Sequence, residues 1–82
     1  MKQVVIGGGS WGTALASVLA QNTDALIWAR DHAVVESINK EHRNSKYQSD
    51  LILPEHLRAT SSLQEAVSDA DLIILVVPSH VM

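Results

Sequence analysis

The hydrophobic pattern at the start of the chain changes its period within a few residues. Lys2–Ile6 is rich in β-branched residues and ends abruptly in glycine, which predicts a short buried strand. From Ser10 the apolar residues recur at helical spacing, which predicts a helix that buries one apolar stripe and ends near Asn22. The stripe consists of Trp11, Ala14, Leu15, Val18 and Leu19. Ala25–Arg30 predicts a second strand, so the first unit is strand, glycine loop, helix and strand.

The middle of the chain predicts a second helix and then an irregular segment. Asp31 can cap this helix, and the polar run 41–50 contains its end and a loop. Its inward-facing positions are Val34, Val35 and Ile38. The proline within Leu51–Leu57 indicates an extended connector and not a central strand.

The last third of the chain predicts two more strands around a short helix. Arg58–Thr60 forms a short strand. Ser61 or Ser62 opens a brief helix, because a glutamine or glutamate stands three residues after each, as in a capping box. Leu72–Val77 is apolar without alternation, which is typical of a strand in a parallel sheet.

Strands that alternate with helices predict an α/β fold with a parallel sheet and right-handed crossovers. By analogy with doubly wound, Rossmann-type folds, the expected strand order is 3-2-1-4. The chain has no repeat, low-complexity stretch or linker, so residues 1–82 are expected to form one domain. We expect this domain to be the front part of a larger fold, incomplete at its C-terminus, because a full fold would add another crossover and strand after Met82.

Composition and charge disfavour several classes of function. The chain has no cysteine, which excludes disulfides and thiolate metal sites, and its four histidines show no metal-binding spacing. A net charge of -3 with only six Lys and Arg residues disfavours a nucleic-acid or basic membrane-binding face. The longest apolar run is far too short to span a bilayer, and no signal-peptide pattern develops. The cytoplasm is the expected compartment.

Gly7, Gly9 and Gly12 form the pattern G-x-G-x-x-G between a predicted strand and a predicted helix, which is the context that this motif requires. Gly7 permits a tight turn, Gly9 lets the backbone approach a pyrophosphate, and Gly12 lets the helix pack closely on the strand. The helix N-terminus adds unpaired N–H groups and a partial positive charge. The motif therefore predicts a dinucleotide-binding loop, in preference to a glycine turn without a ligand.

Two residues of the loop have two interpretations each. Ser10 either gives its hydroxyl to a phosphate or only starts the helix. Trp11 either flanks the cofactor or packs in the core as the first residue of the apolar stripe.

The end of the second strand bears on which dinucleotide fits. An NAD site places an acid there to bind the ribose 2'-hydroxyl, whereas this chain has Arg30 followed by Asp31. A guanidinium can pair with a 2'-phosphate and stack on adenine, so Arg30 predicts NADP(H), with NAD(H) as the second choice. The alternative for Arg30 is a solvated strand end, and Asp31 is interpreted as a helix cap.

The remaining titratable residues carry weaker signals. Surface or loop positions are expected for His32, His42 and His56. His80 follows the last strand at the ligand-binding edge, where it lies near the nicotinamide or belongs to a frayed terminus. Asp69 and Asp71 are interpreted as turn residues at the opposite edge.

The segments GGGSWGTALA, WARD and ATSSLQEAVSDADLIILVVPSHVM together resemble the N-terminal segment of bacterial NAD(P)-dependent glycerol-3-phosphate dehydrogenase, over nearly all 82 residues. The resemblance implies cofactor contacts from several residues beyond the glycines. These are Ser10, Trp11, Arg30, His32 and Tyr47, with Pro78 at the edge of the site. The chain departs from the family pattern at Gly8, where alanine is usual, and after Tyr47, where Gln48 and Ser49 replace leucine and proline.

The resemblance also implies an activity for the complete protein: hydride transfer between sn-glycerol 3-phosphate and dihydroxyacetone phosphate, which feeds phospholipid synthesis. The family's catalytic lysine lies beyond Met82, and none of Lys2, Lys40 and Lys46 matches it. We therefore assign no catalytic residue and expect the 82-residue chain alone to be inactive. Two alternatives remain: another two-domain NAD(P)-dependent reductase, such as a ketopantoate reductase, or a non-catalytic dinucleotide-sensing module. An uncovered last strand would also favour self-association.

Overall fold

The computed structural model describes residues 2–7, 9–21, 23–44 and 52–76. The elements of this part of the chain alternate between strand and helix. In chain order they are β1 (Gln3–Ile6), α1 (Ser10–Leu19), β2 (Ala25–Trp28), α2 (His32–Glu41), β3 (Leu57–Thr60), α3 (Leu63–Val67) and β4 (Leu72–Leu75). The predicted positions Tyr47, Pro78 and His80 lie outside the described residues.

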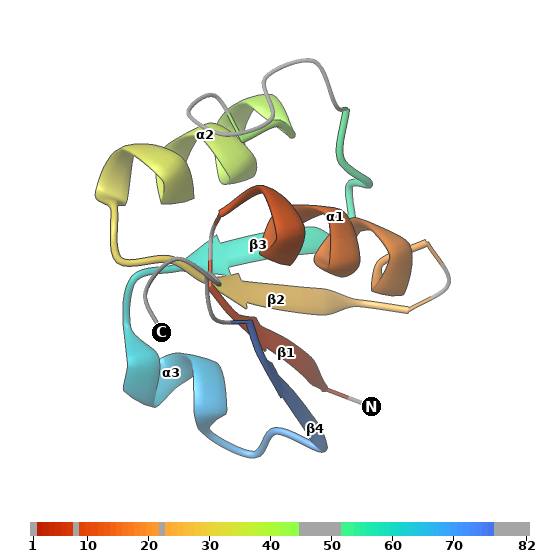
Figure 1. Ribbon diagram of the computed structural model, residues 1–82, viewed down its shortest axis with the longest axis vertical. Coiled ribbons are helices and arrows are strands. Elements are labelled where there is room, and N and C mark those ends of the chain that lie inside the picture. The colour runs from red at the N-terminus through yellow and green to blue at the C-terminus, as the bar shows by residue number, and fades with distance from the viewer. Residues whose placement is uncertain (1, 8, 22, 45–51, 77–82) are drawn as a thin grey trace.

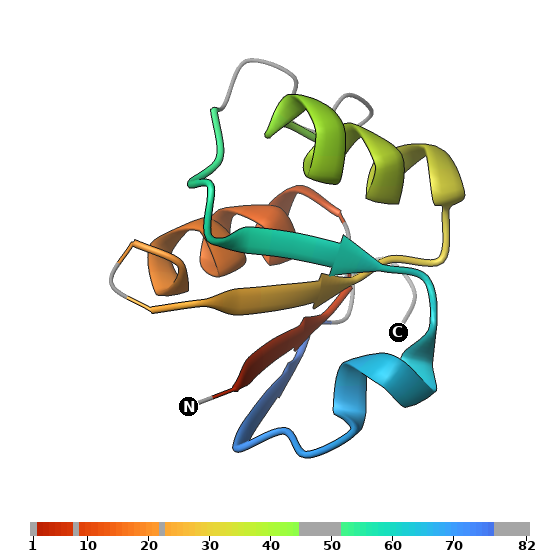
Figure 2. The same cartoon turned by 180° about the vertical axis from the view of Figure 1, so that it is seen from behind.

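The four strands form one parallel sheet in the order β3-β2-β1-β4. In both views of the molecule, α1 and α2 lie on one face of the sheet and α3 lies on the other (Figure 1, Figure 2). The α/β class, the doubly wound arrangement and the strand order are therefore confirmed.

The main core lies between the sheet and the helices α1 and α2. Val5, Ile27 and Leu57 come from the three strands β1, β2 and β3, and each has 1% or less of its surface exposed. Val34 and Ile38 of α2 pack into the same cluster, as predicted. Because side chains alternate along a strand, the neighbouring Val4 faces the other side of the sheet and is buried there.

The helix α1 presents a different face to the sheet from the one predicted. Its buried residues are Gly12, Thr13, Ala16 and Ser17, followed by Ala20 just past its end. Trp11 and Val18, which we expected in the buried stripe, are 82% and 60% exposed. The reason is the close approach of Gly12 to the backbone of Gly7, which turns the small residues of the helix toward the strands. Core packing is therefore the wrong interpretation of Trp11.

Both predicted helix caps are present. The Asp31 side chain accepts a 2.9 Å hydrogen bond from the Ala33 N–H at the start of α2. Ser62 accepts a 3.2 Å bond from the Glu65 N–H at the start of α3, so Ser62, and not Ser61, opens this helix. Each cap satisfies a backbone donor that has no partner within its helix.

The amino ends of the strands carry the expected turn residues. Asp69 adopts a left-handed conformation with φ of 57°, and the Asp71 carboxylate accepts a 2.6 Å hydrogen bond from the Lys2 backbone N–H. This confirms that both aspartates shape the turn into β4. At the other end of the sheet, β2 ends at Trp28, two residues earlier than predicted, so Arg30 follows the strand and is not part of it.

Among the strands that the structure describes, β4 lies at one edge of the sheet and pairs with β1 alone. Two of its side chains, Ile73 and Leu75, are 48% and 68% exposed. Within the described part of the chain, no helix is both long enough and apolar enough to cross a membrane.

Candidate functional site

The carboxyl ends of the four parallel strands meet at one edge of the sheet, and backbone hydrogen bonds join them there. The Gly7 N–H donates to the Trp28 carbonyl at 3.0 Å, which ties the glycine loop to the end of β2. The Val76 N–H donates to the Ile6 carbonyl at 3.0 Å, which places the end of β4 beside the same loop. In open α/β sheets, ligands bind at this edge, where the strand order reverses.

Gly7 and Gly12 are required by the fold itself. Gly7 has a φ of +133°, which side chains other than hydrogen rarely permit, and a Cβ there would lie 2.8 Å from the Val76 carbonyl oxygen. A Cβ on Gly12 would lie only 1.9 Å from the Gly7 carbonyl oxygen. The two glycines therefore bring the loop, the helix α1 and the end of β4 into direct contact.

Gly9 differs from its two neighbours in the motif. It has ordinary extended geometry, with φ of -76° and ψ of -174°, and a Cβ there would meet no atom within 4 Å. The contacts of the folded chain thus give no reason for glycine at this position. The open space beside Gly9 leaves room for the close backbone approach that a pyrophosphate needs.

The start of α1 can receive an anion. Gly9 is its N-cap and forms no side-chain cap, and its first turn carries no acidic residue. By contrast, α2 and α3 are capped by Asp31 and Ser62. The first N–H groups of α1 carry the partial positive charge of the helix, so phosphate oxygens are suitable partners for them. The residues present therefore fit the diphosphate of a dinucleotide.

Trp11 and Ser10 lie at this helix start. Trp11 is the second residue of α1, and its exposed indole is next to the glycine loop in the chain. Ser10 is the first residue of the helix, a position that is compatible with both of its interpretations. Direct contact of either residue with a cofactor remains a prediction.

The end of β2 carries the other predicted contacts. Arg30 is exposed in the connection between β2 and α2, at the same edge as the glycine loop. Asp31 caps α2 through its Oδ1, which agrees with its interpretation as a helix cap. His32 is the exposed first residue of α2, and its Nδ1 lies 3.4 Å from the Ser61 hydroxyl oxygen.

One contact behind the loop was missed by the sequence analysis. The fully buried Asn44 donates a 2.8 Å hydrogen bond from its Nδ2 to the Thr13 hydroxyl in the first turns of α1. Asn44 belongs to the polar run that we interpreted as a loop, and the pattern contains no signal that one of its residues is buried. The contact joins positions 31 residues apart and anchors the segment after α2 behind the glycine loop.

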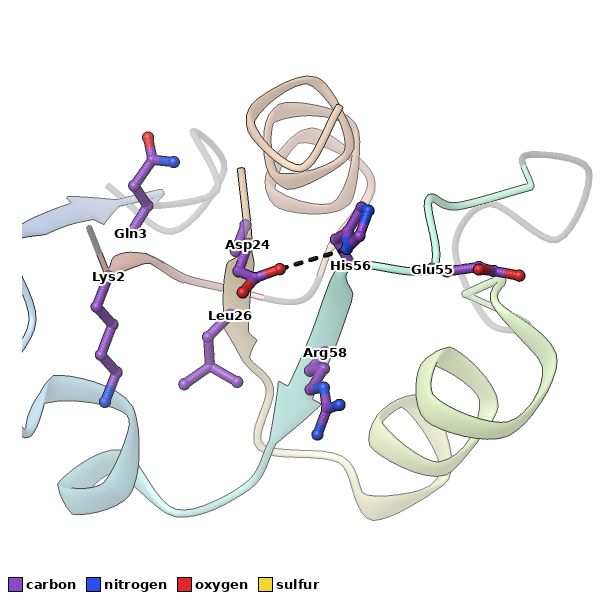
Figure 3. Close-up of a pocket in the computed structure, with 8 residues that line it drawn as sticks. Lys2, Gln3, Asp24, Leu26, Glu55, His56 and Arg58 are labelled. Atoms are coloured by element: carbon purple, nitrogen blue, oxygen red, sulfur yellow. Dashed lines mark ion pairs between the residues drawn. The ribbon is translucent and has the colours of Figure 1, made fainter. Parts of the chain in front are cut away.

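An open pocket lies at the other edge of the sheet, beside the amino ends of the strands (Figure 3). It is lined by Lys2, Gln3, Asp24, Ala25, Leu26, Glu55, His56 and Arg58. Asp24 and His56 approach each other to 3.4 Å, and both side chains are largely exposed, as expected for His56. The lining mixes both signs of charge and lies opposite the glycine loop, so this pocket does not suit a dinucleotide diphosphate. Across the residues the structure describes, no group of three His, Asp or Glu side chains could hold a metal ion.

The parallel sheet, the glycine loop at its carboxyl edge and the uncapped start of α1 place the chain in the class of Rossmann-type α/β domains. A family model described as the N-terminus of NAD-dependent glycerol-3-phosphate dehydrogenase matches residues 2–82. The chain belongs to this family, and the resemblance is thereby confirmed.

Relatives and solved structures agree with this assignment. A glycerol-3-phosphate dehydrogenase [NAD(P)+] of Xanthomonas oryzae is 51% identical over 96% of the chain, and one of Sphingopyxis alaskensis is 46% identical over 98%. The chain spans 24% of the length of each of these relatives. The glycerol-3-phosphate dehydrogenase structure from Saccharomyces cerevisiae matches 98% of this chain and 27% of its own, with a TM-score of 0.88 and 32% identity. A Plasmodium falciparum structure matches 95% of this chain and 25% of its own, with a TM-score of 0.86 and 34% identity.

Proposed function

We propose that this chain is the NAD(P)(H)-binding portion of an oxidoreductase that interconverts sn-glycerol 3-phosphate and dihydroxyacetone phosphate by hydride transfer. The observation that carries the proposal is the open space at Gly9, between two glycines that the fold requires. The names of the relatives supply the reaction. Family membership favours this function over another two-domain reductase or a dinucleotide sensor. The cytoplasm is the proposed compartment, with phospholipid synthesis as the use of the product.

The bound cofactor would supply the hydride chemistry, and the residues of this chain would hold and orient it. The backbone at Gly9 and the first N–H groups of α1 would hold the diphosphate, and the exposed Trp11 would flank the cofactor. Arg30 binds the ribose 2'-phosphate when the cofactor is NADP(H). The family resemblance implies further contacts from His32 and Tyr47, and a place for Pro78 at the edge of the site. No residue of the chain is assigned to proton transfer or to the substrate phosphate.

Replacing Arg30 with alanine should weaken the binding of NADPH and leave the binding of NADH almost unchanged. A charge-assisted bond from the guanidinium to the 2'-phosphate contributes about 1.5 to 3 kcal/mol where water is partly excluded. This corresponds to a roughly tenfold to hundredfold loss of affinity, with salt and exposure favouring the low end. Calorimetric titration of both cofactors at one salt concentration measures the effect.

The matched control for this change is Arg58→Ala. Arg58 is also exposed, but it lines the pocket at the opposite edge of the sheet, so its loss should leave the affinities for both cofactors unchanged. Equal losses for NADH and NADPH on removing Arg30 would contradict the 2'-phosphate assignment and indicate packing or adenine stacking.

The purified 82-residue chain should not turn over dihydroxyacetone phosphate. We assign none of the described residues to the proton transfer or to the phosphate of this substrate. The assay is NADPH oxidation that depends on added dihydroxyacetone phosphate, with enzyme-free and substrate-free blanks. Turnover clearly above both blanks would show that the chain contains catalytic residues that we have not assigned.

We also propose self-association of the chain through β4. The two edge strands of the sheet, β3 and β4, differ in their hydrogen bonds. The side chain of Asn39 in α2 pairs with the backbone of β3. Its amide donates to the Ala59 carbonyl and accepts from the Ala59 N–H, both at 2.9 Å, as a neighbouring strand would. The β4 edge carries the exposed Ile73 and Leu75. An open edge with apolar side chains is a template for another strand.

Sedimentation velocity at about 50 µM should show species larger than the monomer. Leu75→Lys should shift the distribution toward monomer, because a lysine on an edge strand opposes pairing. Val18→Lys is the matched control, since Val18 is similarly exposed but lies on α1. A purely monomeric profile of the unmodified chain, or equal effects of the two lysines, would contradict association through β4.

A further inference from the structure

Three hydrogen bonds within the chain hold the junction between β3 and α3. The indole Nε1 of Trp28 donates to the Ser61 carbonyl at 3.0 Å. The Ser62 N–H donates to the Thr60 hydroxyl at 3.1 Å, and the Ser62 hydroxyl accepts from the Glu65 N–H at 3.2 Å. The backbone of Ser61 is therefore fixed at the carboxyl edge of the sheet.

The side chain of Ser61 contacts the start of α2, which follows the neighbouring strand β2. Its hydroxyl oxygen lies 3.4 Å from Nδ1 of His32, the first residue of α2. Ser61 is half-buried and His32 is exposed. Because the two nitrogens of an imidazole ring lie on different sides of it, the contact at Nδ1 directs Nε2 away from Ser61.

The direction of this hydrogen bond decides what Nε2 can recognise. In a neutral imidazole one nitrogen donates and the other accepts, whereas a hydroxyl can do either. If the Ser61 hydroxyl donates to Nδ1, the ring proton lies on Nε2, which is then a donor. Phosphate oxygens are strong acceptors, so they need such a donor, whereas a ribose hydroxyl can pair with either form of the ring.

We propose that Ser61 is a positioning residue for cofactor choice: its hydroxyl donates to Nδ1 of His32 and holds Nε2–H as a donor for the 2'-phosphate of NADP(H). Ser61 does not itself touch the cofactor in this arrangement. The inference rests on the proposed function, because it uses Arg30 and His32 as the residues at the adenosine end of the site. Cofactor selectivity would then depend on Ser61, between β3 and α3, as well as on Arg30, which follows β2.

Titration of NADPH and NADH into the chain and its Ser61 variants tests the selectivity. Ser61→Ala should weaken NADPH roughly threefold to tenfold and change NADH less than about twofold, because the ring of His32 loses both its fixed proton position and the hydrogen bond that holds its orientation. Ser61→Thr keeps the hydroxyl and should keep the selectivity. Ser62→Ala is the matched control, because it removes the α3 cap and lowers stability without changing the ratio of the two affinities.

The tautomer of His32 tests the hydrogen bond without any cofactor. Nitrogen-15 NMR of the ring, recorded at about pH 8, should find the proton on Nε2 in the unmodified chain and a mixture of both tautomers in Ser61→Ala. A proton found on Nδ1, or an unchanged ratio of affinities in Ser61→Ala, would overturn the inference. Failure of the unmodified chain to bind either cofactor would instead contradict the proposed function. The position of the ring proton would still show whether the Ser61 hydroxyl donates to His32.

Discussion

Replacing Gly9 with valine is expected to abolish binding of both NADPH and NADH while the chain stays folded. The position has extended geometry that any residue adopts, and a Cβ would meet no protein atom within 4 Å. The cost to the fold should therefore be limited to about 1 kcal/mol, because valine is a poor N-cap. The branched side chain would occupy the space into which the diphosphate must come, so both affinities should fall by about a hundredfold or more.

Calorimetric titration of the two cofactors, together with a urea unfolding curve, separates the two effects. The unfolding curve must show a folded variant before the titration is interpreted. Unchanged affinity for either cofactor in the folded variant would show that the diphosphate does not pass beside Gly9, and the proposed site would then be wrong.

Replacing Gly12 with alanine should have the opposite consequence and destabilise the fold itself. The new Cβ would lie 1.9 Å from the carbonyl oxygen and 2.9 Å from the carbonyl carbon of Gly7. Backbone atoms cannot turn aside as a flexible side chain can, so α1 must move away from β1. We expect a loss of about 3 to 5 kcal/mol, more than the roughly 1 to 3 kcal/mol that overpacking usually costs, because the clash is with backbone. This is a large part of the stability of a small domain.

The matched control is Gly9→Ala, which makes the same chemical change three positions earlier in the same motif. Its free energy of unfolding should fall by no more than about 1 kcal/mol, since only the N-cap preference changes. Urea unfolding followed by circular dichroism compares the two variants directly. Equal unfolding midpoints would contradict the role of Gly12 as the contact between helix and loop.

The amino-acid sequence by itself determined those features that depend on neighbouring residues. The aspartate and serine caps and the turn at Asp69 and Asp71 are local preferences of the backbone, and they appear where they were predicted. The predicted strands also form, but β1, β2, β3 and β4 each have an end that differs from the predicted one by one or two residues. The alternation of elements predicted a parallel α/β sheet with right-handed crossovers, and the analogy to doubly wound folds supplied the strand order 3-2-1-4. The glycine motif likewise marked the loop and its edge of the sheet.

Only the tertiary structure decided which face of α1 is buried. Helical spacing placed Trp11 and Val18 inward, because a periodic pattern identifies an apolar stripe but not the neighbour that it meets. The close contact of Gly12 with Gly7 set the rotation of the helix, and a backbone contact of this kind does not appear in hydrophobic periodicity. The same contact leaves Trp11 exposed beside the candidate site.

The tertiary structure also decided which polar residues meet. Asn44 and Thr13 are 31 residues apart in the chain, and Ser61 and His32 are 29 apart. Nothing in the local pattern indicates that these residues form the two pairs. The contact of Ser61 with His32 depends on the parallel alignment of β2 and β3, and that of Asn44 with Thr13 depends on the packing of α1 and α2 on one face of the sheet; both exist only in the folded chain.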